Sequence, residues 1–233
     1  EARNFYLYTA PWLIGFFVLT LYPIVYSFYL MFTDMNLTGV GKFIGLENLK
    51  YAFTDDPLFI KAFINTLKYV VMFVPSSIIL AFFVALLLSK KVKGLGFFRT
   101  AFYIPYITSG VAVTILWGWI YQKDYGIINY VLSLFGIKGV NWLGDKNIAM
   151  ISIVILSLWT IGNNIIIMLA GIQDIPQSYY ESAQIDGAGA IRQIFSITLP
   201  LCTPTIYFNL IVTIIAAFQV FQPVSYTHLT LPT

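Results

Sequence analysis

The amino-acid sequence predicts an all-α fold, namely a polytopic helical bundle that spans a membrane. Hydrophobic residues make up 59% of the 233-residue chain and charged residues only 10%, whereas soluble domains contain about 45–50% apolar and about 25% charged residues. Charges are also absent from five long stretches, at residues 7–33, 69–89, 100–122, 147–173 and 193–233. Each stretch has the roughly 20 residues that an α-helix needs to cross the apolar part of a bilayer.

Five transmembrane helices are therefore expected, near residues 8–32, 67–89, 100–121, 148–172 and 202–222. A very apolar soluble helical core is the alternative, but a soluble helix needs a polar face toward water, and these stretches have none. Tryptophan and tyrosine are enriched where helices leave a membrane. Such residues lie near the expected ends, at Tyr8, Trp12, Tyr69, Tyr121 and Trp142.

Prolines inside the expected spans favour a packed bundle. Each proline removes a backbone donor that lipid cannot replace, so neighbouring helices and hydroxyl side chains have to compensate. These prolines are Pro11, Pro23, Pro75 and Pro105. Glycines are candidates for close approach between helices, and the spans contain Gly15, Gly110, Gly118, Gly162 and Gly171.

A short basic segment sets the predicted orientation. Residues Lys90–Arg99 contain four cations and no acid, which is typical of a cytoplasmic loop. By alternation of the spans, the N-terminal segment and the segment 173–200 also face the cytoplasm.

The spans offer no chemistry of their own. Charged residues inside a membrane mark proton relays and ion sites, and none lies well inside an expected span. A single cysteine, Cys202, and a single histidine, His228, leave no metal site, and zinc-protease and phosphate-loop motifs are absent. A net charge of +3 is too small to indicate nucleic-acid binding. We expect a non-catalytic chain without a bound cofactor, so the energy source of any pump is another chain.

The cytoplasmic segment 176–187 has the pattern of a short helix. Ser178 and Glu181 have the spacing of a capping box, and Gly187 suits the left-handed position that ends a helix. An amphipathic pattern then follows at Ile191, Ile194, Phe195 and Thr198. With Tyr179, Tyr180 and Ile185 exposed to water, the segment reads as a docking surface. The alternative is a helix that lies flat on the lipid interface.

This segment resembles the EAA loop of binding-protein-dependent ABC transporter permeases. Glu181-Ser182-Ala183, Gly187 after three residues, and Ile197-Thr198-Leu199-Pro200 after nine more match that motif, with Ser182 as the only departure. The flanks resemble the carbohydrate-importing branch, and the resemblance covers roughly residues 5–222. The matching flanks include 44–48, 65–66, 104–106, 124–126, 141–144, 170–176 and 217–221.

The resemblance implies a transport subunit of a bacterial inner-membrane importer. Its partners would be a second permease subunit, two ATPase subunits that hold ATP and Mg, and an extracytoplasmic solute-binding protein that delivers a sugar. It implies a first region at 1–66, with one span and an extracytoplasmic loop, and a permease core at 67–222 that carries the EAA loop at 176–200. The residues expected to couple the chain to the ATPase are Glu181, Ser182, Ala183, Asp186, Gly187, Ile197, Leu199 and Pro200.

The substrate path is less defined by the sequence. A sugar needs amide or hydroxyl partners and an aromatic platform, for which Asn163, Asn164, Trp159 and Asn209 are the candidates. Buried amides also bond across helices, so both readings stay open. An importer of glycerol phosphate or another polyol, an ion-gradient carrier and a structural scaffold are the other functions considered.

The resemblance stops near Gln222. Family members continue into a Gly-Gly-rich outer loop and one more helix, which residues 223–233 do not match. We therefore expect five of six transmembrane helices in this chain, and an anomalous, non-native tail at 223–233.

Overall fold

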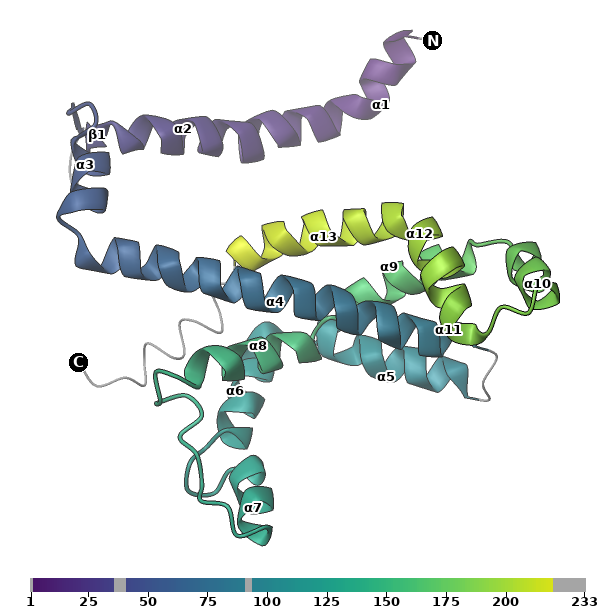
Figure 1. Cartoon of the computed structure of the whole chain (residues 1–233). Helices are drawn as coiled ribbons and strands as arrows, with labels where there is room; N and C mark the ends of the chain where they lie inside the picture. Colours follow the sequence, from purple (N-terminus) through teal and green to yellow (C-terminus); the bar gives the residue numbers. More distant parts are fainter. Residues whose placement is uncertain (1, 36–40, 91–93, 220–233) are drawn as a thin grey trace. The chain divides into compact units, whose positions relative to one another are not determined.

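The computed structural model is mostly helical and describes residues 2–35, 41–90 and 94–219 (Figure 1). The chain divides into two compact units, residues 1–65 and 66–233. Among the described residues, two helices are long and apolar enough to cross a membrane, or up to five spans form if each of three bent helix pairs counts as one. The tail at 223–233 lies outside the described residues.

The first unit begins with one long apolar helix, Phe5–Met31. It consists of α1 (Ala2–Gly15), a π-helix η1 (Phe16–Leu21) and α2 (Tyr22–Met31). A two-stranded antiparallel sheet, β1 (Thr33–Asp34) with β2 (Lys42–Phe43), follows, and then α3 (Glu47–Thr54). The sheet was not expected from the sequence, and it is a small departure from an all-α fold.

Asn48 closes the end of the first span. Its Nδ2 donates to the backbone oxygens of Met31, at 3.1 Å, and Thr33, at 3.0 Å. The last carbonyls of a helix have no partner within the helix. The Asn48 amide therefore supplies the hydrogen bond that the Met31 carbonyl would otherwise lack.

Both π-helices end two residues before a proline. Residues Phe16–Leu21 precede Pro23, and the π-helix η2 (Ile194–Thr198) precedes Pro200. A proline offers no backbone N–H, and its ring crowds the carbonyl four residues earlier. The wider π turn, with Leu199 N–H bonded to the Ile194 oxygen, fits a helix that continues past this obstacle.

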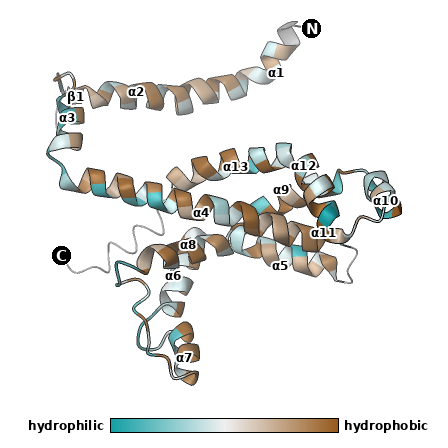
Figure 2. Ribbon diagram, viewed as in Figure 1, coloured by the Kyte–Doolittle hydropathy of each residue, from teal (hydrophilic) through white to brown (hydrophobic). Residues whose placement is uncertain are grey.

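The second unit contains three bent helix pairs where single helices were expected, near 100–121, 148–172 and 202–222. The pair α5 (Leu95–Ile107) and α6 (Gly110–Ile120) bends by 98°, and α8 (Ala149–Trp159) and α9 (Gly162–Gln173) by 53°. The segment Ala190–Leu201 and α13 (Thr203–Phe218) bend by 66°. The long helix α4 (Pro57–Ser89) is continuous despite Pro75, and apolar residues follow it along much of its length (Figure 2).

The break after α5 has a local cause. Thr108 takes an extended backbone with ψ 142°, and its hydroxyl and amide both donate to the Ile104 oxygen, at 2.8 and 3.1 Å. The Ile104 carbonyl oxygen thus accepts two hydrogen bonds at the point where the helix ends. A search for apolar segments gives no sign of such a break, because both halves are apolar.

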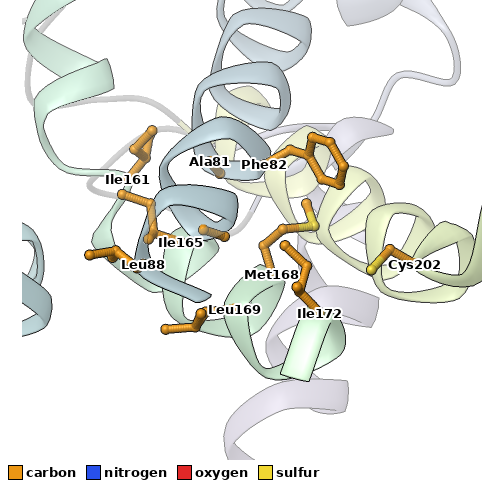
Figure 3. Close-up of a cluster of buried hydrophobic side chains, with 10 residues drawn as sticks. Ala81, Phe82, Leu88, Ile161, Ile165, Met168, Leu169, Ile172 and Cys202 are labelled. Carbon is orange, nitrogen blue, oxygen red and sulfur yellow. The ribbon is translucent and has the colours of Figure 1, made fainter. Parts of the chain in front are cut away.

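The core of the second unit forms around α9 (Figure 3). Buried side chains of α4 meet those of α9 and the buried Cys202 at the bend before α13. The cluster is Ala81, Phe82, Ala85, Leu88, Ile161, Ile165, Met168, Leu169, Ile172 and Cys202. Met168 and the two alanines are fully buried, so these side chains are shielded from solvent where α4 packs against α9.

Two glycines of α9 let neighbouring helices come close. A Cβ on Gly162 would collide with the carbonyl oxygen of Phe102 in α5 and lie 3.0 Å from the Cα of Tyr103. A Cβ on Gly171 would collide with the Thr205 hydroxyl of α13. The expectation of close approach is thus confirmed at these two positions. It is wrong at Gly118, where nothing lies within 4 Å of a Cβ.

The loop between α6 and α8 is organised by one buried amide. It contains α7 (Ile127–Leu134), and Asn129 of this helix is 6% exposed. Its Nδ2 donates to the Lys123 and Val140 oxygens, and its Oδ1 accepts from the Val140 amide and the Trp142 indole. All four contacts are between 2.8 and 3.0 Å, so the loop has a defined conformation.

Candidate functional site

The helix α10 (Gln177–Ile185) carries the first half of the predicted coupling loop. Its N-cap is Pro176, and no side chain caps it. The expected capping box of Ser178 and Glu181 is therefore wrong. Pro176 has φ −57° and ψ 133°, so the helix begins one residue before Ser178, which then lies within its first turn.

The end of α10 is a Schellman turn at Gly187. Gly187 has φ +75°, the left-handed region that only glycine enters without cost. Its amide donates to the Gln184 oxygen at 3.0 Å, and the amide of Ala188 donates to the Ala183 oxygen at 2.8 Å. These two bonds define the motif and confirm the sequence-based prediction for this glycine.

Most of the predicted loop residues are accessible. On α10 and the turn, Glu181, Ser182, Asp186 and Gly187 are exposed, while Ala183 is half-buried. Tyr179 and Ile185 are also exposed, by 53% and 87%, as the docking hypothesis expects. Tyr180, which was expected to be exposed with them, is half-buried.

The chain returns through α11 (Ala190–Gln193), η2 and α12 (Leu199–Leu201). The predicted α-helical face is wrong here, because the π turn breaks its period. Ile191 and Phe195 are exposed by 74% and 65%, whereas Thr198 is 2% exposed. Of the predicted coupling residues in this part, Ile197 and Leu199 are half-buried and Pro200 is exposed.

The two halves of the loop contact each other through polar side chains. The Tyr180 hydroxyl lies 2.9 Å from Thr198 Oγ1, and Gln193 Nε2 donates to the Ala188 oxygen at 2.8 Å. A cavity of about 170 Å³ between the halves brings together three predicted residues, Ala183, Asp186 and Ile197. Neither Tyr180 nor Gln193 was predicted to bind another residue, because a hydroxyl or amide alone gives no partner.

A larger cavity of about 550 Å³ lies behind α10. Its walls come from the ends of α4 and α9 and from α10, α11 and η2, and they include both Tyr180 and Thr198. The contact between these two side chains is therefore part of the wall that separates α10 from the end of the spans.

The candidate substrate-path residues lie where α9 approaches α13. Asn164 Nδ2 donates to Thr213 Oγ1 at 2.8 Å, and Asn209 Nδ2 donates to the backbone oxygen of Asn164 at 3.3 Å. Asn209 is fully buried, and its Oδ1 has no hydrogen-bond partner among the described residues. Two of the four candidates thus join helices, which is the alternative that the sequence left open.

The other two candidates are differently placed. Asn163 is half-buried on α9. Trp159 is 41% exposed, and its ring lies edge-on to that of Trp117 with centroids 5.9 Å apart. This pair of indole rings at the break between α8 and α9 offers an aromatic surface. The role of all four residues in substrate contact stays a prediction.

Apolar spans, helix breaks and an accessible helical loop between the last two bent pairs define a multi-pass membrane permease. Residues 57–228 match the family model for binding-protein-dependent transport system inner membrane components. The chain belongs to this family, and it is an inner-membrane protein that crosses the bilayer several times.

Curated relatives and solved structures agree with this assignment. The chain is 40% identical over 220 residues to the probable ABC transporter permease protein YesP of Bacillus subtilis, which covers 94% of this chain and 71% of the relative. It is 35% identical over 223 residues to the arabinooligosaccharides transport system permease protein AraP of the same species, covering 93% and 69%.

A chain in the crystal structure of a bacterial alginate ABC transporter, in complex with an alginate pentasaccharide-bound periplasmic protein, has the same fold. It is 27% identical with a TM-score of 0.73, and the match covers 91% of this chain and 72% of that one. The resemblance to ABC permeases that the sequence suggested is thus confirmed.

Proposed function

We propose that this chain is the permease subunit of a bacterial ABC importer that translocates a carbohydrate. In this proposal it binds no ATP and pairs with a second permease subunit. Two separate ATPase subunits drive it with ATP and Mg, and an extracytoplasmic binding protein delivers the sugar. Five spans from this chain, each bent pair counting as one, would line the membrane part.

The observation that carries the proposal is the exposed α10 with its Schellman end. Glu181, Ser182 and Asp186 are accessible, and Gly187 has the left-handed backbone that its position in the motif requires. A short rigid helix between two spans, with no internal use for its exposed polar residues, fits a groove on a partner protein. The matched motif indicates that this partner is the ATPase.

The fold also supports a mechanical coupling. Closure of the ATPase dimer would displace α10, and the bundle would respond as a rigid body with two stable positions. Such a mechanism needs no ionisable group inside the membrane. The helices α6, α8, α9 and α13 contain no charged residue, in agreement with this proposal.

The proposed carbohydrate substrate has two lines of support. Relatives of the chain include an arabinooligosaccharide permease and a permease of an alginate transporter. The neutral amides and the indole pair near the break at Thr160–Ile161 offer hydrogen bonds and a flat apolar surface, which are the groups that a neutral sugar ring matches. A polyol phosphate would favour cations in the path.

Crosslinking tests the docking of α10. Ala183 is half-buried, so Ser182→Cys, an exposed position in the same motif, is the better probe in a Cys202→Ser background with all partner subunits co-expressed. We expect a crosslink, formed with a thiol-directed bifunctional reagent, to an ATPase subunit, with a yield that changes with ATP. Ser133→Cys on α7, also exposed and helical, is the control and should give none.

Equal crosslinking from both positions, or none from Ser182→Cys in a correctly inserted chain, would contradict the docking proposal. Such a result would favour an ion-gradient carrier, whose transport depends on a sodium or proton gradient and not on ATP.

The neighbouring residues Asn163 and Asn164 separate substrate contact from helix packing. Asn164→Ala should lower the free energy of unfolding by about 1 kcal/mol, because it removes an interhelical bond, while Asn163→Ala should leave it unchanged. If Asn163 contacts the sugar, its replacement should instead reduce transport by about five- to ten-fold. Denaturant titration and uptake by reconstituted transporter measure the two effects. Unchanged uptake with Asn163→Ala would remove this residue from the path.

A further inference from the structure

The contact between Tyr180 and Thr198 joins two parts of the loop that otherwise meet at a turn. Tyr180 lies in the middle of α10, and Thr198 is the last residue of η2, two residues before Pro200. Their oxygens are 2.9 Å apart. Thr198 is 2% exposed and Tyr180 is half-buried, so the hydrogen bond between them is partly shielded from water and from the competition that water offers.

The covalent connection between these parts transmits movement poorly. It runs through residues 186–189, which include Gly187 and Gly189, and glycine has the freest backbone of all residues. Gln193 braces only the end of this turn, through the Ala188 oxygen. If α10 were pushed with no other contact, the turn could absorb the movement by changing its dihedral angles.

The segment beyond Thr198 is placed to receive such a push. It continues through α12 to Cys202, where the chain bends by 66° into α13. Cys202 is fully buried in the core cluster with α4 and α9. A displacement that reaches Thr198 therefore reaches the bend, and with it the base of the last span.

We propose that Tyr180 is a positioning residue whose hydrogen bond to Thr198 makes α10 and η2 move as one body, so that displacement of α10 is passed to α13. This inference rests on the proposed function and adds to it a specific contact outside the predicted coupling residues. Tyr180 lies on the side of α10 that faces Thr198, whereas the exposed Glu181 and Ser182 are accessible to the partner.

The test uses Tyr180→Phe, which keeps the ring and removes the hydroxyl, in the complete transporter reconstituted in lipid nanodiscs. Tyr179→Phe is the matched control, because Tyr179 is the adjacent residue and is 53% exposed. Loss of one side-chain hydrogen bond should reduce about five-fold the ratio of molecules in which α10 and η2 are held together to molecules in which they are not. We expect fewer sugar molecules transported per ATP for Tyr180→Phe and no change for Tyr179→Phe.

A distance measurement separates this role from a general loss of stability. Spin labels at Ser178→Cys on α10 and Tyr207→Cys on α13, both exposed positions, report the spread of distances in a Cys202→Ser background without nucleotide. Tyr180→Phe should broaden the distribution, and Thr198→Val, which also removes the 3.5 Å bond from Thr198 Oγ1 to the Gln193 oxygen, should broaden it at least as much. The double variant should show no change beyond that of Thr198→Val, because Thr198→Val already removes the bond that Tyr180→Phe removes.

An unchanged distribution with Tyr180→Phe, or an unchanged transport ratio, would overturn the inference. Additive effects in the double variant would also overturn it, because the two hydroxyls would then act separately. Failure of the proposed function would give a different experimental result. The unaltered chain would then show neither the ATP-dependent crosslink from Ser182→Cys nor an ATP-dependent distance change.

Discussion

Replacement of Gly187 by proline is expected to abolish ATP-driven transport while the chain still inserts into the membrane. A proline ring holds φ near −65°, and Gly187 has φ +75°, so the Schellman turn cannot form. The variant also loses the amide that donates to the Gln184 oxygen. We expect at least a ten-fold loss of uptake and loss of substrate-stimulated ATP hydrolysis, measured in reconstituted transporter.

A milder pair of variants supplies the control. Gly187→Ala keeps the amide but places a Cβ in the left-handed region, which costs about 1–2 kcal/mol. Gly189→Ala makes the same chemical change two residues later, at φ −68° and with open space around the new Cβ. We expect impaired coupling only from Gly187→Ala. Normal stimulated hydrolysis in Gly187→Pro would show that the turn is not needed for coupling.

Replacement of Gly162 by alanine is expected to be the most destabilising small change in the spans. Its Cβ would meet backbone atoms of Phe102 and Tyr103, which cannot rotate away as a side chain could. Overpacking of this kind costs about 1–3 kcal/mol. The free energy of unfolding of the purified protein in mixed micelles should fall by about 2 kcal/mol.

Gly118→Ala is the matched control for this change. Gly118 also lies in an apolar helix, α6, but nothing lies within 4 Å of a Cβ at that position. Its replacement should leave the free energy of unfolding unchanged or raise it slightly. Equal stability of the two variants would mean that α5 and α9 can separate without loss.

Sequence reasoning located the apolar segments well, because transfer into a membrane depends on composition over about 20 residues. It missed the bends, which depend on single dihedral angles such as that of Thr108. Both halves of each bent pair are apolar, so a search for long apolar segments does not separate them.

The predicted coupling loop also contains features that the sequence could predict and features that it could not. Gly187 was predictable because its residue type and its backbone angle are directly related. The start of α10 was not, since Pro176 could begin the helix as well as Ser178 could. The Tyr180–Thr198 contact joins residues 18 apart, and only the three-dimensional path of the chain brings them together.

The uncharged helices described above also have an electrical consequence. A charge that crosses the membrane field exchanges about 2.3 kcal/mol per 100 mV with it. Since α6, α8, α9 and α13 contain no charged side chain, their rocking displaces almost no gating charge. In the proposed importer, the membrane potential would therefore neither drive nor oppose the movement of these helices, and the work of switching them would enter through the proposed contact of α10 with the ATPase.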